Sequence, residues 1–294
     1  MKKISYSQFS QWKECPFRWK LNYIDRLRDR TENISSLFGT SMHEVLQTYI
    51  KTMYSETIEN ASKLDLNRML LERMKANYQK AKENNSDMDI TAQDMAGHYA
   101  DGLNILDWFV RHRHEYFTKR GHELIGVEVP LDFPIQEGIV FTGYLDIVIR
   151  DTVTNRYRIY DIKTSHQGWN KYQKKDKKKL AQLVLYKMFY ALQFDVDPQD
   201  IDVEFIIVKR KLWENMDFPQ KRIQRLSPPS GTITQKALLT ELKEFVDACF
   251  NADGTHKTDG VFEKTPSVKA CKYCEYKEKP DICDRNKRPR RKKK

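Results

Sequence analysis

The sequence predicts a protein of the α/β (α+β) class, in which helices flank a mixed β-sheet. Two observations predict this class. Most of the first 120 residues lie in segments whose apolar side chains recur with the helical period. From Gly121 onward, short segments rich in Val, Ile and Phe follow one another with one helical segment among them, in the order β-β-β-α-β. Such an order is typical of a twisted sheet with helices packed against it.

The individual elements follow from the same patterns. The aromatic-rich stretch "SYSQFSQWKECPFRWKLNYIDRL" predicts a helix that Ser5 or Ser7 caps and that Pro16 breaks or restarts. Further helices are expected at 35–54, 65–84, 91–117, 178–194 and 229–250. Strands are expected at 122–135, 137–150, 156–165 and 202–210. The cysteine-rich stretch "SVKACKYCEYKEKPDICDRN" is expected to be a loop.

These elements divide the chain into four regions. A mostly helical N-terminal region, 1–120, contains Cys15 and His43. A sheet-containing core is expected at 121–226, followed by a C-terminal helix and cysteine region at 227–284. The last region, 285–294, is a basic tail.

The charge of the chain is unevenly distributed. The formal net charge is +11, and the tail "RNKRPRRKKK" alone contains eight Lys or Arg and no acid. A second cluster, "KYQKKDKKK" at 171–179, has six lysines against one aspartate. Each run could be an ordinary solvated surface, but together they favour contact with a polyanion such as DNA.

Composition also excludes several classes of protein. At 39% hydrophobic and 12% aromatic residues the chain is globular rather than disordered. It contains no apolar run of about 18 residues and no secretory leader pattern, so we expect a cytoplasmic protein without a membrane span. A disulfide framework is not expected there. A Gly-Lys-Ser/Thr phosphate loop is absent from the sequence, so an ATPase motor is not expected.

Two predicted strands bring acidic side chains together. The turn "DTVTN" joins them, and a hairpin centred at 153–154 would place Asp146 opposite Asp161. Asp161 and Lys163 point to the same face because they lie two positions apart on one strand. Facing like charges destabilise a sheet unless a cation offsets them, and carboxylates suit Mg²⁺ or Mn²⁺. The alternative is a surface ion pair between Asp161 and Lys163.

The order of the motifs resembles that of the PD-(D/E)XK nuclease superfamily, and within it the RecB-like branch. The stretches that carry the resemblance are "SYSQFSQWKECP", "GTSMHEV", "GYLDIV", "YDIKTS" and "AQLVLYKMFY". The resemblance runs from Ser5 to Cys283. It implies a restriction-endonuclease-like core at 121–226 and a metal-dependent hydrolysis of phosphodiester bonds in DNA. One departure is Asp161, where the family more commonly has Glu.

The resemblance also implies roles for individual residues. His43, Asp146, Asp161 and the backbone carbonyl of Ile162 would hold the metal, and Lys163 would act on the attacking water. Gln182 and Tyr186 lie one helical turn apart and would face the site and help to position DNA. Glu128, on the preceding strand, is a further candidate acid. His43, Gln182 and Tyr186 could otherwise be ordinary helix residues.

Four cysteines form a separate pattern. The spacing Cys271-x2-Cys274-x8-Cys283 in a reducing compartment indicates metal ligation, and Cys15 is the candidate fourth ligand. Cys249 is expected to be a buried small apolar residue. The resemblance to AddB-like and CRISPR-associated adaptation nucleases implies a [4Fe-4S] cluster that joins the two ends of the chain. Zinc is the alternative occupant.

The expected substrate is DNA with single-stranded or double-stranded ends. The lysine cluster and the tail are the candidate DNA-contacting groups: Lys171, Lys174, Lys175, Lys177, Lys178, Lys179, Arg290 and Arg291. The resemblance favours an exonuclease in recombination, repair or phage DNA metabolism of a bacterial cell, with a helicase or recombination protein as a candidate partner. An inactive nuclease-fold protein that only binds DNA, and an RNA-processing enzyme, are the alternatives.

Overall fold

The computed structural model describes residues 1–27, 32–84 and 88–283. Within these ranges, none of the helices has the length and apolar character needed to span a membrane. The chain divides into two compact units that interleave along the sequence. Unit 1 comprises 1–30, 132–143 and 231–294, and unit 2 comprises 31–131 and 144–230. The four sequence regions expected above stay a prediction.

The strands of the described residues belong to one mixed sheet with the order β1-β3-β4-β5-β6, and β2 pairs with β3 in addition. The bounds are β1 Lys2–Ser5, β2 His122–Gln136, β3 Ile139–Asp151, β4 Tyr157–Ser165, β5 Ile201–Lys209 and β6 Ile223–Leu226. In unit 2, β4 runs antiparallel to β3 and parallel to β5, and β6 runs antiparallel to β5. The predicted β-β-β-α-β order is therefore confirmed.

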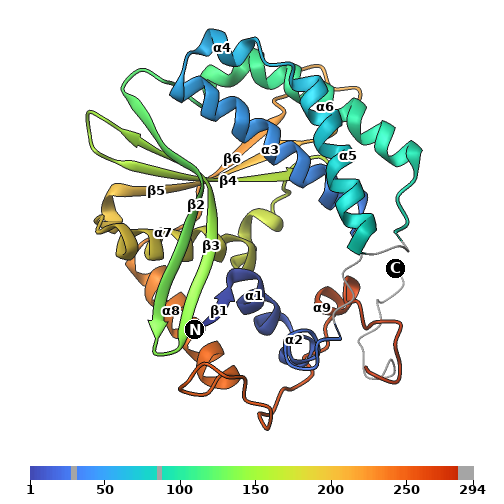
Figure 1. The fold of residues 1–294 in the computed structure, drawn as a ribbon, viewed down its shortest axis with the longest axis vertical. Helices are drawn as coiled ribbons and strands as arrows, with labels where there is room; N and C mark the ends of the chain where they lie inside the picture. Colours follow the sequence, from blue (N-terminus) through green and yellow to red (C-terminus); the bar gives the residue numbers. More distant parts are fainter. Residues whose placement is uncertain (28–31, 85–87, 284–294) are drawn as a thin grey trace. The chain divides into compact units, whose positions relative to one another are not determined.

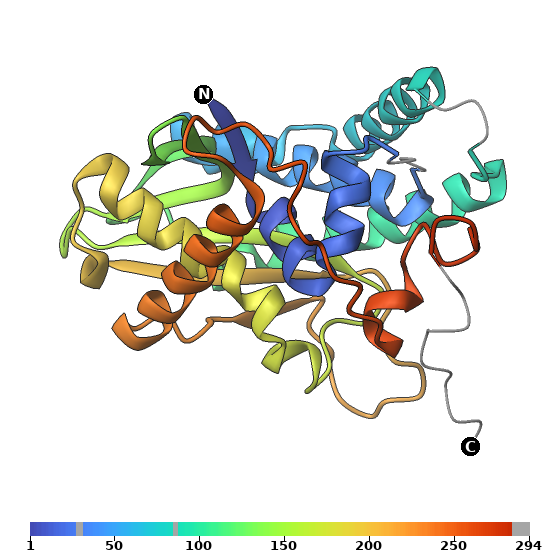
Figure 2. The ribbon, with the colours of Figure 1, turned by 90° about the horizontal axis from the view of Figure 1, so that it is seen from below.

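Helices cover both faces of the unit 2 part of the sheet (Figures 1 and 2). On one face lie α3 (Ile34–Ser55), α5 (Leu66–Asn84) and α6 (Ala92–His112), with the short α4 (Ile58–Ser62). On the other face α7 (Lys177–Phe194) packs against β4 and β5. The helix α3 begins at Asn33, whose side chain accepts a hydrogen bond from the Ser36 N–H. The helix α6 begins with a capping box between Thr91 and Asp94.

An apolar core of unit 2 lies between the sheet and α3, α5 and α6. Side chains two positions apart on neighbouring strands enter it, among them Ile147, Ile149, Tyr160 and Ile162. The period of two therefore turns the residues between them, Asp146 and Asp161, to the opposite face. This alternation decides where the polar side chains of the sheet can meet.

Unit 1 contains β1, α1 (Tyr6–Glu14), α2 (Pro16–Tyr23), α8 (Thr232–Cys249) and α9 (Val268–Lys272). Pro16 begins α2, as expected, because proline lacks the N–H that the first turn of a helix leaves unpaired. Trp19 is fully buried, and its ring packs against Phe245, Phe250 and Phe262. The unit 1 core is thus aromatic and joins the first helices to the C-terminal segment.

The structure corrects the sequence prediction at the short elements. The strands β1 and β6 were not expected, and both have only four residues. The segment expected to be a cysteine-rich loop contains the helix α9, which Ser267 caps. Four or five residues are too few to show a period-two or helical pattern in the sequence. Elements this short are stabilised by contacts with neighbouring segments.

Candidate active site

The two aspartates of the hairpin meet as the turn predicts. The β3–β4 ladder pairs Ile147 with Tyr160, so the next residues along it, Asp146 and Asp161, stand opposite each other. The Ile162 N–H donates a hydrogen bond to Asp146 Oδ2 at 2.6 Å, which orients this carboxylate across the strands. The sheet therefore holds two carboxylates side by side, near His43 of α3 and Tyr186 of α7.

Asp161 and Lys163 form an ion pair whose carboxylate is buried and whose lysine is partly exposed. Asp161 is 3% exposed, and the Lys163 ammonium lies 2.6 Å from its Oδ2 atom. Burying a carboxylate is costly unless a cation or hydrogen bonds accompany it. The structure thus contradicts the alternative of a solvated pair on an exposed strand face.

The helix α3 brings His43 to the same place. Its Nδ1 atom lies 3.6 Å from Asp146 Oδ2, and its ring hydrogen-bonds to the backbone of Ile162. Gly39, one turn earlier, allows this approach, because a Cβ atom there would lie 3.0 Å from the Thr164 hydroxyl. The Gly-x-x-x-His spacing thus has a physical reason. The glycine lets α3 pack close to β4, and this places the His43 ring one turn later beside Asp146.

Gln47 belongs to this group and was not identified from the sequence. It lies one turn after His43 on α3 and is buried. Its amide donates to Glu128 Oε1 at 2.5 Å and to the Asp146 carbonyl at 3.4 Å. Glu128 itself has φ of +50°, a conformation that non-glycine residues rarely adopt. The four-residue spacing from His43 was the signal that could have revealed Gln47.

Gln182 and Tyr186 share one face of α7, as predicted. The Gln182 amide donates to the Tyr186 hydroxyl at 3.2 Å. Tyr186 is buried, and burial raises its pKa, with Asp161 and Asp146 acting in the same direction. Tyr186 therefore lies within electrostatic reach of both aspartates, and its hydroxyl stays protonated at neutral pH.

Burial shifts the protonation of the charged groups. It raises the pKa values of Asp146 and Asp161 to about 6, against the opposing effect of Lys163. It lowers the pKa of His43 to about 4, although Asp161 opposes this shift. For Lys163, burial acts to lower the pKa, but the two aspartates outweigh it and raise the pKa. At neutral pH the group thus combines two anionic carboxylates, a neutral imidazole and one ammonium.

The donor chemistry of this group fits a divalent cation. Two carboxylates, a neutral imidazole and a backbone carbonyl are ligands that Mg²⁺ and Mn²⁺ accept, and the single ammonium of Lys163 leaves negative charge uncompensated. Across residues 1–27, 32–84 and 88–283, however, no three or more His, Cys, Asp and Glu side chains are already arranged to hold a metal ion. The residues fit the ion, and their side chains would adjust around it.

The four predicted cluster cysteines, Cys15, Cys271, Cys274 and Cys283, line one pocket of about 140 Å³ in unit 1. Phe17, Arg18 and Tyr276 are among the other residues around it. The described residues do not hold three or more of these thiols in a metal-binding arrangement. The fifth cysteine, Cys249, is fully buried on α8, as predicted, and burial raises the pKa of its thiol.

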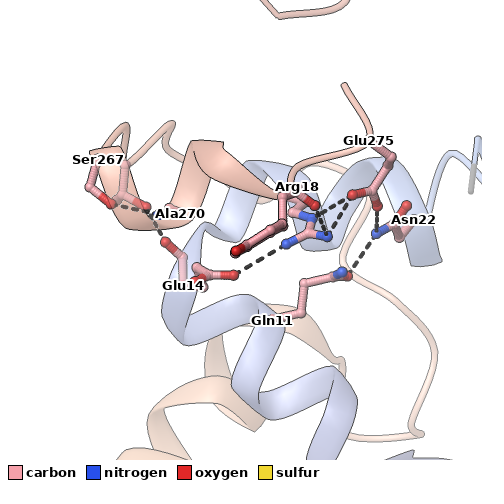
Figure 3. Close-up of polar contacts among 9 residues, drawn as sticks. Gln11, Glu14, Arg18, Asn22, Ser267, Ala270 and Glu275 are labelled. Atoms are coloured by element: carbon pink, nitrogen blue, oxygen red, sulfur yellow. Dashed lines mark hydrogen bonds and ion pairs between the residues drawn. The ribbon is translucent and has the colours of Figure 1, made fainter. Parts of the chain in front are cut away.

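Polar contacts join the helix α2 to the cysteine segment in unit 1 (Figure 3). Arg18 lies 2.6 Å from Glu275 Oε2 and also contacts Glu14. Asn22 donates to Glu275 Oε1 and to Gln11 Oε1, both at 2.8 Å. The Tyr276 hydroxyl donates to Asn22 at 2.6 Å. These contacts hold α2 against the segment with the C-terminal cysteines, beside the pocket that Cys15 also lines.

The lysine cluster lies at the start of α7, directly after the loop that follows β4. Asp176 caps α7 by accepting from the Lys178 N–H, and Lys174 and Lys175 belong to a short 3-10 helix, Gln173–Lys175. The Lys179 ammonium lies 4.8 Å from the centre of the Trp169 ring. Lys171, Lys175, Lys177 and Lys179 are exposed. Arg290 and Arg291 lie outside the described residues.

A helix-flanked mixed sheet with an Asp/Asp/Lys group on adjacent strands defines a nuclease-type core. The chain belongs to the PD-(D/E)XK nuclease superfamily, whose family model matches residues 3–283. No curated protein shows significant similarity to it. Among solved structures, a "Putative exonuclease" from Eubacterium rectale is 10% identical with a TM-score of 0.49, over 99% of this chain and 90% of that one. The protein SSO0001 is 12% identical with a TM-score of 0.31, over 90% of this chain and 93% of that one.

Replacing Gln47 with Ala is expected to lower metal-dependent nuclease activity about 10- to 100-fold, the effect typical of residues that orient metal ligands. The variant would leave Glu128 and the Asp146 carbonyl without their shared donor. Steady-state cleavage rates at several metal concentrations measure the effect, which should appear as a weaker apparent metal affinity. Thr48→Ala is the control, because the Thr48 hydroxyl donates a hydrogen bond within α3, to the Glu44 carbonyl. Equal losses in both variants would contradict a role for Gln47 at the site.

Proposed function

We propose that the chain is a Mg²⁺- or Mn²⁺-dependent deoxyribonuclease of the RecB-like branch that degrades DNA from free ends. The observation that carries the proposal is the group of Asp146, the buried Asp161 and Lys163, with His43 3.6 Å from Asp146. A protein gains no stability from two adjacent buried carboxylates with one counter-charge. Such an arrangement is typical of a site that a cation completes.

The residues of the site have separate roles in this proposal. Asp146, Asp161, His43 and the Ile162 carbonyl would hold the cation, which would supply Lewis-acid polarisation of a phosphate. Lys163 orients the attacking water and stabilises the charge that develops on the phosphate. Gln182 and Tyr186 position the DNA backbone from α7. Gln47 keeps Asp146 and Glu128 in place.

DNA is the proposed substrate because the lysine cluster follows the site along the chain. Lys171, Lys174, Lys175, Lys177, Lys178 and Lys179 would neutralise phosphates close to the cut, and the tail would add affinity that does not depend on sequence. Recombination, repair or phage DNA metabolism, with a helicase or recombination partner in the bacterial cytoplasm, is the proposed context. That context rests on the motif order alone.

The pocket of unit 1 is proposed to hold a [4Fe-4S] cluster through Cys15, Cys271, Cys274 and Cys283. The support is the gathering of four thiols around one pocket, since thiolates are the usual ligands of iron–sulfur clusters and of structural zinc. Zinc remains the alternative occupant. The proposed role is structural, because all four cysteines belong to unit 1 and the candidate active site belongs to unit 2.

The function is tested with end-labelled linear DNA and covalently closed circular DNA, each incubated with anaerobically purified protein and Mg²⁺, Mn²⁺ or a chelator. Metal-dependent loss of the linear DNA alone is expected. The order in which label from each end is released then gives the polarity. Cutting of the closed circle would replace the exonuclease assignment with an endonuclease. Binding of DNA without cutting under any metal would establish the inactive DNA-binding protein instead.

Nuclease activity is expected to fall as the pH drops below about 6, because the metal binds ionised carboxylates. Asp146 and Asp161 have pKa values of about 6 in the folded chain, above the ordinary value of about 4. The protonated form of each carboxyl group therefore favours the folded, metal-free protein. This contribution to the free energy of unfolding is fully present below about pH 4 and is lost as the pH rises through about 6.

Thermal melting with and without Mn²⁺ checks the sign of this effect. The increase in Tm on adding Mn²⁺ should be larger at pH 8 than at pH 5, because protons compete with the metal at pH 5. Asp161→Asn is the control and should lose most of the difference between the two pH values. An equal increase at both pH values in the wild-type protein would contradict metal binding at these two carboxylates.

A further inference from the structure

Two loops of unit 2 leave the sheet at the same edge. The strands β4 and β5 are parallel and in register, with Ser165 beside Lys209, so the loops 166–176 and 210–222 both begin at their carboxyl ends. The Arg210 N–H donates to the Ser165 carbonyl at 2.8 Å, and the Lys211 N–H donates to the His166 carbonyl at 2.7 Å. The two loops therefore form one continuous surface, here called the loop edge.

The loop edge exposes large aromatic rings. Tyr172 is 75% exposed, Trp213 is 57% exposed and Phe218 is 59% exposed. The backbone of Trp213 is held in place, because its N–H donates to the Gln220 side chain at 2.9 Å and its carbonyl accepts from the same side chain at 2.7 Å. By contrast, Trp169 on the first loop is buried against Phe205. These exposed rings on the two hydrogen-bonded loops are available to stack against a partner.

Positive charge surrounds these rings. Residues 209–222 contain five Lys or Arg and two acids. The buried Asp101 anchors Arg210 at 3.1 Å and Lys211 at 2.6 Å. The ammonium of Lys171 lies 5.2 Å from the centre of the Tyr172 ring. Burial and nearby Lys174 lower the pKa of Lys209, so cations of the two loops lie close enough to affect each other. Some of these cations are already paired, Lys221 with Glu115 as well as Arg210 and Lys211 with Asp101. The remaining positive charge beside exposed rings would complement a partner that is both aromatic and anionic.

The loop edge is close to the candidate active site along the sheet. Asp161 lies four residues before Ser165 on β4, which corresponds to about 13 Å at the rise of a β-strand. Tyr144, 60% exposed, lies two residues before Asp146 on β3 and so points to the face of the site. A strand of nucleic acid held at the loop edge could thus reach the carboxylates within a few nucleotides.

From these observations we infer that the loop edge binds single-stranded DNA, with bases stacked on Tyr172, Trp213 and Phe218 and phosphates against the surrounding lysines and arginines. Exposed rings among cations are the usual means of holding a single strand, because its bases present free faces. In a duplex the base faces are already stacked, so the rings would gain nothing. The inference deepens the proposed function by naming the form of DNA that enters the site.

Binding, rather than cleavage, tests the inference. Asp161→Asn serves as the background so that DNA stays intact, and fluorescence anisotropy measures the Kd of a labelled single strand and of a blunt hairpin duplex. Adding Trp213→Ala and Phe218→Ala together should weaken single-strand binding at least about fivefold and leave duplex binding unchanged. Trp213→Phe with Phe218→Tyr should restore it. Val153→Ala, 85% exposed at the other end of β4, is the matched control and should change neither affinity.

Unchanged single-strand affinity in the double alanine variant would overturn the inference. A loss of self-association in light scattering at the same time would make the loop edge a surface for a second copy of the chain instead. Failure of the proposed function gives a different pattern: no cleavage by the wild-type protein, while the double alanine variant still binds single strands more weakly.

Discussion

Replacing Asp161 with Asn should reduce metal-dependent DNA cleavage about 10³-fold or more, while the protein stays folded. The side chain keeps its size but loses the charge that the cation requires. Since burial already raises the pKa of Asp161 to about 6, removing the charge relieves a desolvation cost. The Tm of the metal-free variant at pH 7 should therefore equal or exceed that of the wild-type protein.

Glu204 offers a matched control for this prediction. It is a buried carboxylate on β5 whose charge is satisfied, because Arg225 donates two hydrogen bonds to it at 2.6 and 2.8 Å. Glu204→Gln should lower the free energy of unfolding by about 1–3 kcal/mol and keep the cleavage rate of the folded fraction. The two variants are thus expected to have opposite effects on activity and stability. Loss of activity in both, in proportion to lost stability, would show that Asp161 is merely structural.

The second large effect concerns the cysteines. Replacing Cys274 with Ser should abolish the broad absorbance near about 400 nm and the bound iron of anaerobically purified protein. It should also unfold much of unit 1, because bound metal contributes on the order of 10 kcal/mol to small metal-stabilised domains. Iron analysis, visible spectra and limited proteolysis measure these losses. The contacts of Arg18 and Asn22 with Glu275 should preserve some association of α2 with the cysteine segment.

Cys249→Ala is the control for this experiment, since Cys249 lies in the apolar core on α8 and outside the pocket. It should keep the colour and the iron content of the wild-type protein. A colourless wild-type protein with one zinc per chain would replace iron–sulfur with zinc. A wild-type protein free of both metals, with unit 1 still resistant to protease, would contradict the metal site.

Helices and strands were predictable from the sequence where the hydrophobic pattern extends over many residues. The strands β2 to β5 and the helices α3, α5, α6, α7 and α8 have enough residues for a period to show. The turn "DTVTN" also predicted the register, and the pairing of Ile147 with Tyr160 agrees with it. The strands β1 and β6 were missed because four residues carry no period. The interleaving of the two units was missed because it depends on contacts far apart in the sequence.

The geometry of the candidate site was only partly predictable. Asp146 and Asp161 follow from strand register, and Gln182 and Tyr186 follow from helical spacing. The burial of Asp161 does not follow from the sequence, because an Asp-x-Lys pattern looks the same on a buried and on a solvent-exposed face of a strand. Gln47 was missed although its four-residue spacing from His43 places both on one face of α3. Its partners, Glu128 and the Asp146 carbonyl, lie far from it in the sequence, and such contacts leave no local pattern.

Asp146 on β3 and Asp161 on β4 are proposed to bind a divalent cation that the nuclease reaction requires. Calorimetric titration of Mn²⁺ into the wild-type, Asp161→Asn and Glu204→Gln proteins at pH 8, without DNA, tests this proposal most directly. One Mn²⁺ should bind per chain in the wild-type and Glu204→Gln proteins, and binding should be lost in Asp161→Asn. Equal Mn²⁺ binding by wild type and Asp161→Asn would place the cation elsewhere and contradict the account.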